Sequence, residues 1–172
     1  ENIQYMGPSA EISVILKTQA SLFSNVFKDR IPDLQKRFTP EQFQLYMQPR
    51  IAQWTQITDS LCNLHKHSRK AVHLMRNKLK IEEAYTLLDF LSFRSYYAKD
   101  NPDNQALQAK EEPSYYDFLK EFPLNDETIL ADERMDIFIN RFEYMSPLEK
   151  IYQTNSTIPL PDSIRFTYPK NG

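Results

Sequence analysis

The residue types best suited to metal binding or acid–base chemistry gather in one basic segment. All three histidines, His65, His67 and His73, lie there, in a stretch that is expected to be helical. A metal ion bound on one helix needs ligands at positions i and i+3 or i+4. His65 and His67 are only two positions apart, and His73 lies about 12 Å from His65 by helical rise. The spacing therefore does not predict a zinc site on these histidines.

Other kinds of catalytic site need motifs that the chain lacks. Its two glycines, Gly7 and Gly172, lie at the ends, so no glycine-rich loop can cradle a phosphate. Neither a Gly-x-Ser-x-Gly elbow nor a Glu-x-x-His pair occurs. The single cysteine, Cys62, excludes an internal disulfide, and its place at the edge of an apolar stripe indicates an inert buried thiol.

We therefore predict no catalytic residue, no metal ligand and no cofactor. An enzymatic alternative would need acid–base groups that meet in a cleft. The residues on which such a site would have to be built are His65, His73, Glu82 and Glu83.

The basic segment raises the question of an anionic partner. Residues 60–81 contain no acid between them, and five side chains share the helix face opposite the apolar stripe: Lys66, Lys70, His73, Asn77 and Lys80. This face is either a patch for an anionic partner or a face that is solvated or paired with acids elsewhere. Residues 111–143 hold ten acids and can supply that pairing. The formal net charge of −2 favours neither nucleic acid nor a membrane surface.

Two tyrosine pairs, Tyr96–Tyr97 and Tyr115–Tyr116, offer a second kind of surface. Such side chains line a ligand groove, or they pack their rings at helix edges and leave the hydroxyl in water. Both interpretations stay open. Together with the basic face, the tyrosines give the predicted interaction surface, which consists of Lys66, Lys70, His73, Lys80, Tyr96, Tyr97, Tyr115 and Tyr116.

Residues 39–99 should determine the architecture, because they contain no glycine and only two prolines, Pro40 and Pro49. A stretch without the usual turn residues favours helix. Thr39, Pro40 and Gln42 match a capping box at its start, and Pro49 should kink or restart the helix. An apolar stripe over residues 50–79 predicts one rod of about 45 Å. A break within residues 63–68 is the alternative.

The chain as a whole is predicted to be an all-α bundle of about five to seven helices with one long central helix. The long helical stretch is expected to continue over residues 81–99. Shorter helices are expected from Ser9 to near Arg30 and over residues 114–122, and one helix or a helix pair is expected from Asn125 or Asp126 to residue 145. The expected buried face of the last one consists of Met135, Phe138, Ile139, Phe142 and Met145.

The two ends of the chain are expected to differ from this helical body. Residues 1–152 form the predicted helical domain, and residues 153–172 form an extended tail that leads towards a following domain. Short strand-like arms are expected at both termini, over residues 3–6 and 164–168, where apolar residues gather or alternate with polar ones.

Part of the C-terminal half resembles a known family. The residues that carry the resemblance are Ser114-Tyr115-Tyr116-Asp117-Phe118-Leu119, Pro123-Leu124-Asn125-Asp126 and Phe138-Ile139-Asn140-Arg141-Phe142-Glu143-Tyr144-Met145. This stretch resembles the helical region of TlpA-like thiol-disulfide reductases of the Gram-negative cell envelope. In that family the region lies between an N-terminal β-rich domain and a C-terminal thioredoxin-like domain. The start of the chain, residues 5–12, is similar to the entry into the same region.

The resemblance implies a non-catalytic role, because in that family a Cys-x-x-Cys motif on the thioredoxin fold does the redox work. This chain has only Cys62, so no catalytic residue is carried over. The implied function is a helical scaffold or interaction domain of a thioredoxin-like oxidoreductase, located in the periplasm or cell envelope. Its implied partners are neighbouring domains of the parent chain or a protein client. Nucleic acid is not expected as a partner, and no apolar run is long enough to span a bilayer.

An alternative function does not depend on the resemblance. The chain would then be an independent ligand- or peptide-binding helical module. Its groove would be lined by aromatic side chains of the segments 90–97 and 115–122.

Overall fold

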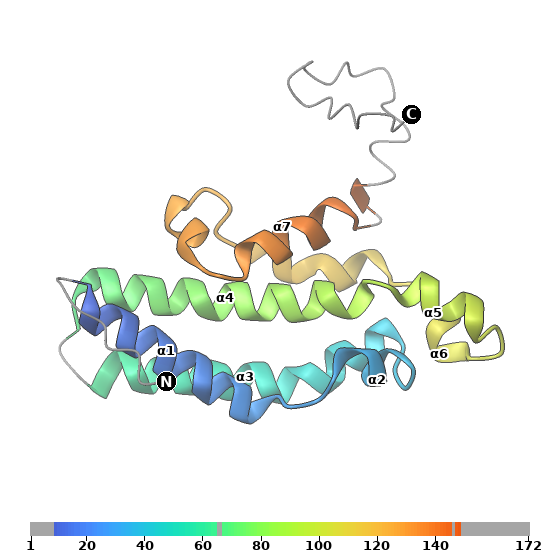
Figure 1. The fold of residues 1–172 in the computed structure, drawn as a ribbon, viewed down its shortest axis with the longest axis horizontal. Coiled ribbons are helices and arrows are strands. Elements are labelled where there is room, and N and C mark those ends of the chain that lie inside the picture. Colours follow the sequence, from blue (N-terminus) through green and yellow to red (C-terminus); the bar gives the residue numbers. More distant parts are fainter. Residues whose placement is uncertain (1–8, 65–66, 146, 149–172) are drawn as a thin grey trace, which may run out of the picture.

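The computed structural model describes residues 9–64, 67–145 and 147–148, and every regular element in these residues is a helix. This confirms the predicted all-α class. Helix α4 (Arg69–Leu91) is central, since it contacts α1, α2, α3, α7 and two 3₁₀ helices. Figure 1 shows α4 between two layers, with α1 to α3 on one side and α7 on the other. The predicted arms at residues 3–6 and 164–168 and the tail from 153 lie outside the described residues.

The predicted rod over residues 50–79 is two helices instead of one. Helix α3 (Pro40–Leu64, 25 residues) ends before α4 (23 residues) begins, and the two pack against each other as an antiparallel pair. Ser68 makes the new start, because its side chain accepts a hydrogen bond from the amide of Ala71. Pairing buries both apolar faces, which one isolated rod would leave in water. At the far end of the pair, Phe43 stacks on Phe90 with ring centroids 3.8 Å apart.

The start of α3 follows its sequence signal closely. The amide of Gln42 donates to Oγ1 of Thr39 at 3.2 Å, and the amide of Thr39 donates to Oε1 of Gln42 at 3.0 Å. These two bonds complete the capping box. Pro49 lies inside α3, so the helix does not restart there. Next to it, Nη1 of Arg50 donates to the carbonyl of Tyr46 at 2.8 Å.

One layer is held to α3 and α4 by aromatic and buried polar contacts. Helix α1 (Ala10–Val26) places Phe23 in the core, where the indole of Trp54 donates to its carbonyl at 3.2 Å. Gln19 is fully buried, and its Nε2 donates to Oγ1 of Thr58 and to the carbonyl of Met75, each at 2.9 Å. The short helix α2 (Ile31–Gln35) completes this layer.

The second layer consists of shorter elements, which are the 3₁₀ helices η1 (Pro113–Glu121) and η2 (Glu127–Ala131) and the helix α7 (Met135–Glu143). The helices α5 (Arg94–Asp100) and α6 (Gln105–Gln108) pack on each other beyond the end of α4 (Figure 1).

The predicted buried face of α7 is right in part. Met135 and Phe138 are buried, and Phe142 and Met145 pack against the core. Ile139 is 41% exposed, so its assignment to the buried face is wrong. The reason is geometric: a surface helix that packs on one side buries a narrow stripe, and Ile139 lies beside the row of Met135, Phe138 and Phe142.

Candidate functional site

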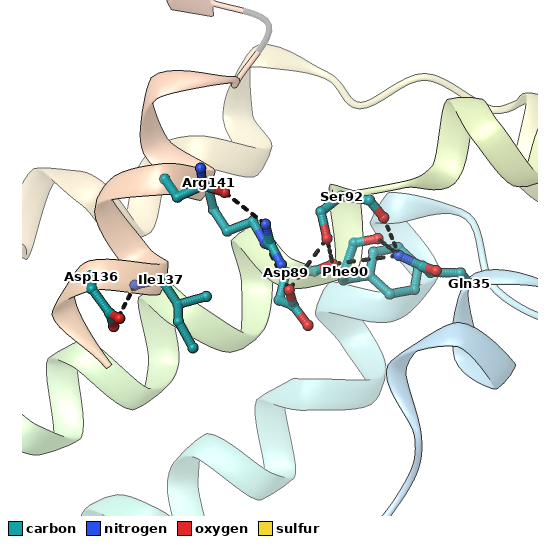
Figure 2. Close-up of polar contacts among 8 residues, drawn as sticks. Gln35, Asp89, Phe90, Ser92, Asp136, Ile137 and Arg141 are labelled. Atoms are coloured by element: carbon teal, nitrogen blue, oxygen red, sulfur yellow. Dashed lines mark hydrogen bonds and ion pairs between the residues drawn. The ribbon is translucent and has the colours of Figure 1, made fainter. Parts of the chain in front are cut away.

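The candidate site begins where α4 stops. Its last carbonyls are satisfied by side chains in place of a further turn of helix. Nε2 of Gln35 donates to the carbonyls of Phe90 at 2.7 Å and Ser92 at 2.5 Å, while Oγ of Ser92 donates to the carbonyl of Asp89 at 2.7 Å. Figure 2 shows Gln35 reaching these groups from the α2 side. The chain can therefore leave the axis of α4 and begin α5 in a new direction.

Phe93 makes that change of direction in an unusual conformation. Its φ is 61° and its ψ is −2°, and no other non-glycine residue in the described part of the chain has a positive φ. A bulky side chain is disfavoured there by on the order of 1–3 kcal/mol. Burial of the ring does not offset this, since Phe93 is 61% exposed. Its ring instead lies beside the guanidinium of Arg141, whose Cζ is 5.3 Å from the ring centroid.

Arg94 holds the next turn in place from inside. It is only 6% exposed, and its guanidinium donates to four backbone carbonyls: those of Gln35 and Phe38, and those of Ala106 and Ala109. Burial lowers the pKa of this guanidinium from its usual value. Because its donors face carbonyls and not a carboxylate, Arg94 keeps a net positive charge under the surface here.

Arg141 connects α7 to the end of α4. Its Nε donates to Oδ1 of Asp89 at 2.8 Å, and Nη1 donates to Oδ1 of Asn140 at 2.8 Å. Figure 2 shows Arg141 extending from α7 towards Asp89 and Ser92. Both partners of the Arg141–Asp89 pair are about one-fifth exposed, so the pair lies at the edge of the core.

A hollow of about 760 Å³, which we name the α5 groove, lies over these residues. Its walls come from the end of α4, from α5, from residues 107–111 and from the end of α7. Phe93 and Tyr144 line it with rings that are 61% and 70% exposed. The charged side chains in its lining are Arg94, Lys99, Lys110, Arg141 and Glu111.

A second hollow of about 600 Å³ lies at the start of α3 beside η1. It shares Ala109 and Lys110 with the α5 groove. Its charge is the opposite, because its lining carries Glu41, Glu83 and Glu112. The two hollows are therefore neighbours of unlike sign.

The predicted basic face on α4 is mostly paired. Nε2 of His73 lies 2.5 Å from Oδ2 of Asp126, and Nζ of Lys80 lies 2.7 Å from Oε2 of Glu121. Both acids come from the segment that was expected to supply the pairing. Lys70 is exposed, and Lys66 lies outside the described residues. The structure thus favours the paired interpretation for His73 and Lys80, and whether the face binds a partner stays a prediction.

Asp126 is the best-connected acid of this contact. Its carboxylate accepts hydrogen bonds from the hydroxyl and amide of Thr128 and from Nδ2 of Asn77. These bonds, led by that from the Thr128 hydroxyl, hold the pKa of the Asp126 carboxyl well below its usual range. Asp126 therefore anchors the start of η2 on α4 as a carboxylate.

The four tyrosines of the predicted surface divide between core and surface. Tyr115 and Tyr116 are 2% and 9% exposed, so their rings pack into the core, and each also lines one of the two hollows. Their part in an interaction surface stays a prediction. The hydroxyl of Tyr115 donates to the carbonyl of Leu87 at 2.8 Å, and burial raises its pKa well above the usual value. Tyr96 is 62% exposed, and the half-buried ring of Tyr97 lies beside Nζ of Lys36.

The residues of the enzymatic alternative are directed to different partners. Glu82 pairs with Arg134 at 2.8 Å, Glu83 lies 3.7 Å from Lys80, and His73 is occupied by Asp126. His65 lies outside the described residues. Among the residues that are described, no group of three His, Cys, Asp or Glu side chains is placed to hold a metal ion. Burial raises the pKa of the half-buried Cys62 thiol, which makes its thiolate scarcer at neutral pH.

Sequence reasoning missed two arginines that shape the α5 groove, Arg94 and Arg141, and it missed the backbone conformation of Phe93. A signal existed for Arg94, because a lone arginine within the aromatic run from Phe90 to Tyr97 indicates a cation drawn into an apolar environment. The left-handed conformation of Phe93 has no signal, since that region favours glycine.

Comparisons with protein-family models, with curated proteins and with solved structures find no match to this chain. Within the described residues, no helix has both the length and the apolar character needed to cross a membrane.

Proposed function

We propose that this chain is a non-catalytic helical interaction domain and that the α5 groove is its binding face. The observation that carries the proposal is Phe93. A strained backbone is retained where the surrounding structure over-determines it, and such residues cluster at binding and catalytic sites. Here the strain presents an aromatic ring to solvent at the rim of a hollow. Exposed aromatic rings beside arginine are typical of the side chains that dominate binding energy at protein interfaces.

The parent protein is proposed to be a TlpA-like thiol-disulfide oxidoreductase of the cell envelope. The support is the resemblance of residues 114–145, which form η1, η2 and α7 over one side of α4. The α5 groove lies at the end of this layer, where α7 finishes. In this proposal the chain positions a neighbouring thioredoxin-like domain or a protein client and leaves the redox chemistry to a Cys-x-x-Cys motif elsewhere.

Two measurements test the parent assignment. The gene should continue past Gly172 into a thioredoxin-like domain with a Cys-x-x-Cys motif after a strand. The isolated chain should not reduce insulin disulfides above the rate of buffer with dithiothreitol alone. Insulin reduction by the chain that disappears in Cys62→Ser would overturn the non-catalytic proposal.

The binding face is tested by NMR on the ¹⁵N-labelled chain, titrated with that downstream domain. Amide shifts should cluster at residues 88–99 and 140–145. Ser95→Trp, which places a large ring in the α5 groove, should weaken the interaction. Ser21→Trp, on the exposed part of α1, is the matched control and should leave it unchanged. Equal weakening by both variants would contradict the assignment of the face.

A second candidate function is an independent ligand- or peptide-binding module. The α5 groove favours it, because its volume of about 760 Å³ lies within the usual 300–1,000 Å³ of ligand sites. Phe93 and Tyr116 line the groove and belong to the two aromatic segments from which such a groove was expected. A reading frame without a thioredoxin domain, together with binding at the α5 groove, would favour this candidate over the first.

A further inference from the structure

The α5 groove is basic although the chain is acidic overall. Four of its lining residues are cations and one, Glu111, is an acid, whereas the whole chain has a formal charge of −2. The pair of Arg141 with Asp89 removes one cation, and the groove still keeps an excess of positive charge. A concave surface with one sign of charge attracts ligands of the opposite sign.

The four cations of the α5 groove differ in what they can offer to a ligand. Arg94 and Arg141 are fixed by carbonyls and by Asp89, so they contribute potential but few new hydrogen bonds. Lys99 and Lys110 are exposed and form no ion pair within the described part of the chain. Their ammonium groups are therefore the ones available to a carboxylate.

The same hollow also offers apolar contact. Half of its lining is apolar or aromatic, and the exposed rings of Phe93 and Tyr144 stand at its rim. Interfaces between proteins combine aromatic side chains and arginine with a polar rim in this way. Pockets for small amphiphiles are lined predominantly by apolar side chains, and this one is not.

We propose that the α5 groove binds an acidic segment of a partner protein, in which aspartate or glutamate side chains alternate with aromatic or aliphatic ones. Its carboxylates pair with Lys99 and Lys110, and its apolar side chains pack on Phe93 and Tyr144. This inference rests on the proposed function and specifies the chemistry of the partner. It does not favour the chain's own residues 149–172 as the occupant, because they carry three cations against two acids.

The test is fluorescence anisotropy with the full chain and a fluorescein-labelled peptide in which aspartate alternates with phenylalanine and leucine. A peptide with lysine at the aspartate positions and one with serine at the apolar positions are the matched controls. Each control peptide should bind about tenfold more weakly or worse, since each loses one half of the recognition. Equal binding of the aspartate and lysine peptides would overturn the proposal.

Variants then locate the binding. The double variant Lys99→Glu with Lys110→Glu should weaken binding of the aspartate peptide by about tenfold or more. Lys28→Glu with Arg30→Glu changes the net charge equally at exposed positions outside both the groove and the basic face of α4, and should have little effect. A control pair that weakens binding as much as the groove pair would place the site elsewhere and overturn the proposal.

Phe93→Gly separates binding from folding. Glycine accepts the positive φ without strain, so the thermal midpoint of unfolding should not fall. Removal of the ring should weaken binding of the aspartate peptide by about tenfold. Phe93→Ala should also weaken binding of the peptide, but it should keep the backbone strain. If Phe93→Gly binds the peptide as well as the parent chain does, the ring is not a contact and the proposal fails.

Two competitors distinguish other occupants. Dodecanoate that displaces the labelled peptide with higher affinity would identify a small amphiphile as the ligand. A synthetic peptide of residues 149–172 that displaces it would identify the chain's own tail. Either result overturns the proposed partner class. If the aspartate peptide fails to bind while Ser95→Trp still weakens binding of the downstream domain, the proposed function stands and only this inference is lost.

Discussion

At the scale of single residues, the charges around α4 are largely used inside the molecule. Lys78 and Asp132 form a pair at 3.0 Å in which both side chains are about one-tenth exposed, and Arg134 pairs with the buried Glu82. Buried pairs of this kind fix the position of one element on another. They contribute little net stability, because desolvation opposes the attraction. The α5 groove differs from these contacts, since two of its lysines are left to solvent.

Glu82 allows the balance between desolvation and attraction in a buried ion pair to be measured. Burial raises the pKa of its carboxyl, and the nearby Arg134 and Lys78 only partly oppose that shift. The folded state thus holds the proton more tightly than the unfolded state. The stability from this group is complete below the ordinary pKa of 4.5 and is lost as the pH rises through the folded value.

Glu82→Gln should therefore change the pH profile more than the stability at neutral pH. Between about pH 4 and pH 7, the free energy of unfolding of the parent chain should fall relative to that of the variant. At pH 7 the free energies of unfolding of the two should agree within about 1 kcal/mol, because Arg134 is 30% exposed and stays in contact with water when its partner is neutral. Urea unfolding followed by circular dichroism measures both, with the exposed Glu127→Gln as a control. A variant that is less stable by about 3 kcal/mol or more at every pH would show that the Arg134 pair dominates.

At the scale of elements, the start of α3 is the most local feature of the fold. Thr39→Ala and Gln42→Ala each remove one bond of the capping box and should each lower the free energy of unfolding by about 1 kcal/mol. The double variant should lose less than the sum, because the two bonds form one motif. Thr55→Ala in the middle of α3 is the control and should be neutral, since alanine favours helix. Urea titrations of the four variants decide this, and additive losses would argue against a coupled motif.

The connection of α5 and α6 to the body depends instead on a long-range contact. Arg94→Lys keeps the charge but cannot reach four carbonyls, because an ammonium lacks the forked geometry of guanidinium. We expect a loss of about 2–4 kcal/mol that is concentrated in the α5–α6 region. Hydrogen exchange should speed up at residues 94–109 more than in α3. Uniform acceleration throughout the chain would mean that Arg94 supports the whole core equally.

These two elements also show what sequence can predict about helices. The capping box was predictable because its donors and acceptors lie within four consecutive residues. The end of α4 was not predictable, because Gln35, which satisfies its last carbonyls, is far away in the sequence. The division of the predicted rod into α3 and α4 falls between these cases. Ser68 is a helix-start signal, but only the burial of two facing apolar stripes makes it decisive.

At the scale of the whole molecule, the all-α class and the central helix followed from a glycine-free stretch that pairs with itself. The candidate site did not follow in the same way. Its position between the aromatic segments was indicated by Phe93 and Tyr116, yet its net charge comes from Arg94, Lys99 and Lys110, which meet only in the folded chain. Sequence patterns predict which helix faces are apolar. They do not predict which charged side chains come together on the surface of the folded chain.

The central position of α4 makes a last prediction, that both layers unfold together. Phe138 of α7 is 1% exposed and stacks on Phe122 with ring centroids 4.3 Å apart, whereas the single tryptophan, Trp54, lies in α3 on the other side of α4. Phe138→Ala should lower the free energy of unfolding by about 3–5 kcal/mol. Because α4 contacts α3 and α7 alike, Trp54 fluorescence and far-ultraviolet circular dichroism should report the same lowered midpoint in urea. Ile139→Ala, at a position 41% exposed on the same helix, should change it by less than about 1 kcal/mol. A Trp54 transition that stays in place while the helical signal shifts would show that the layers are separate folding units.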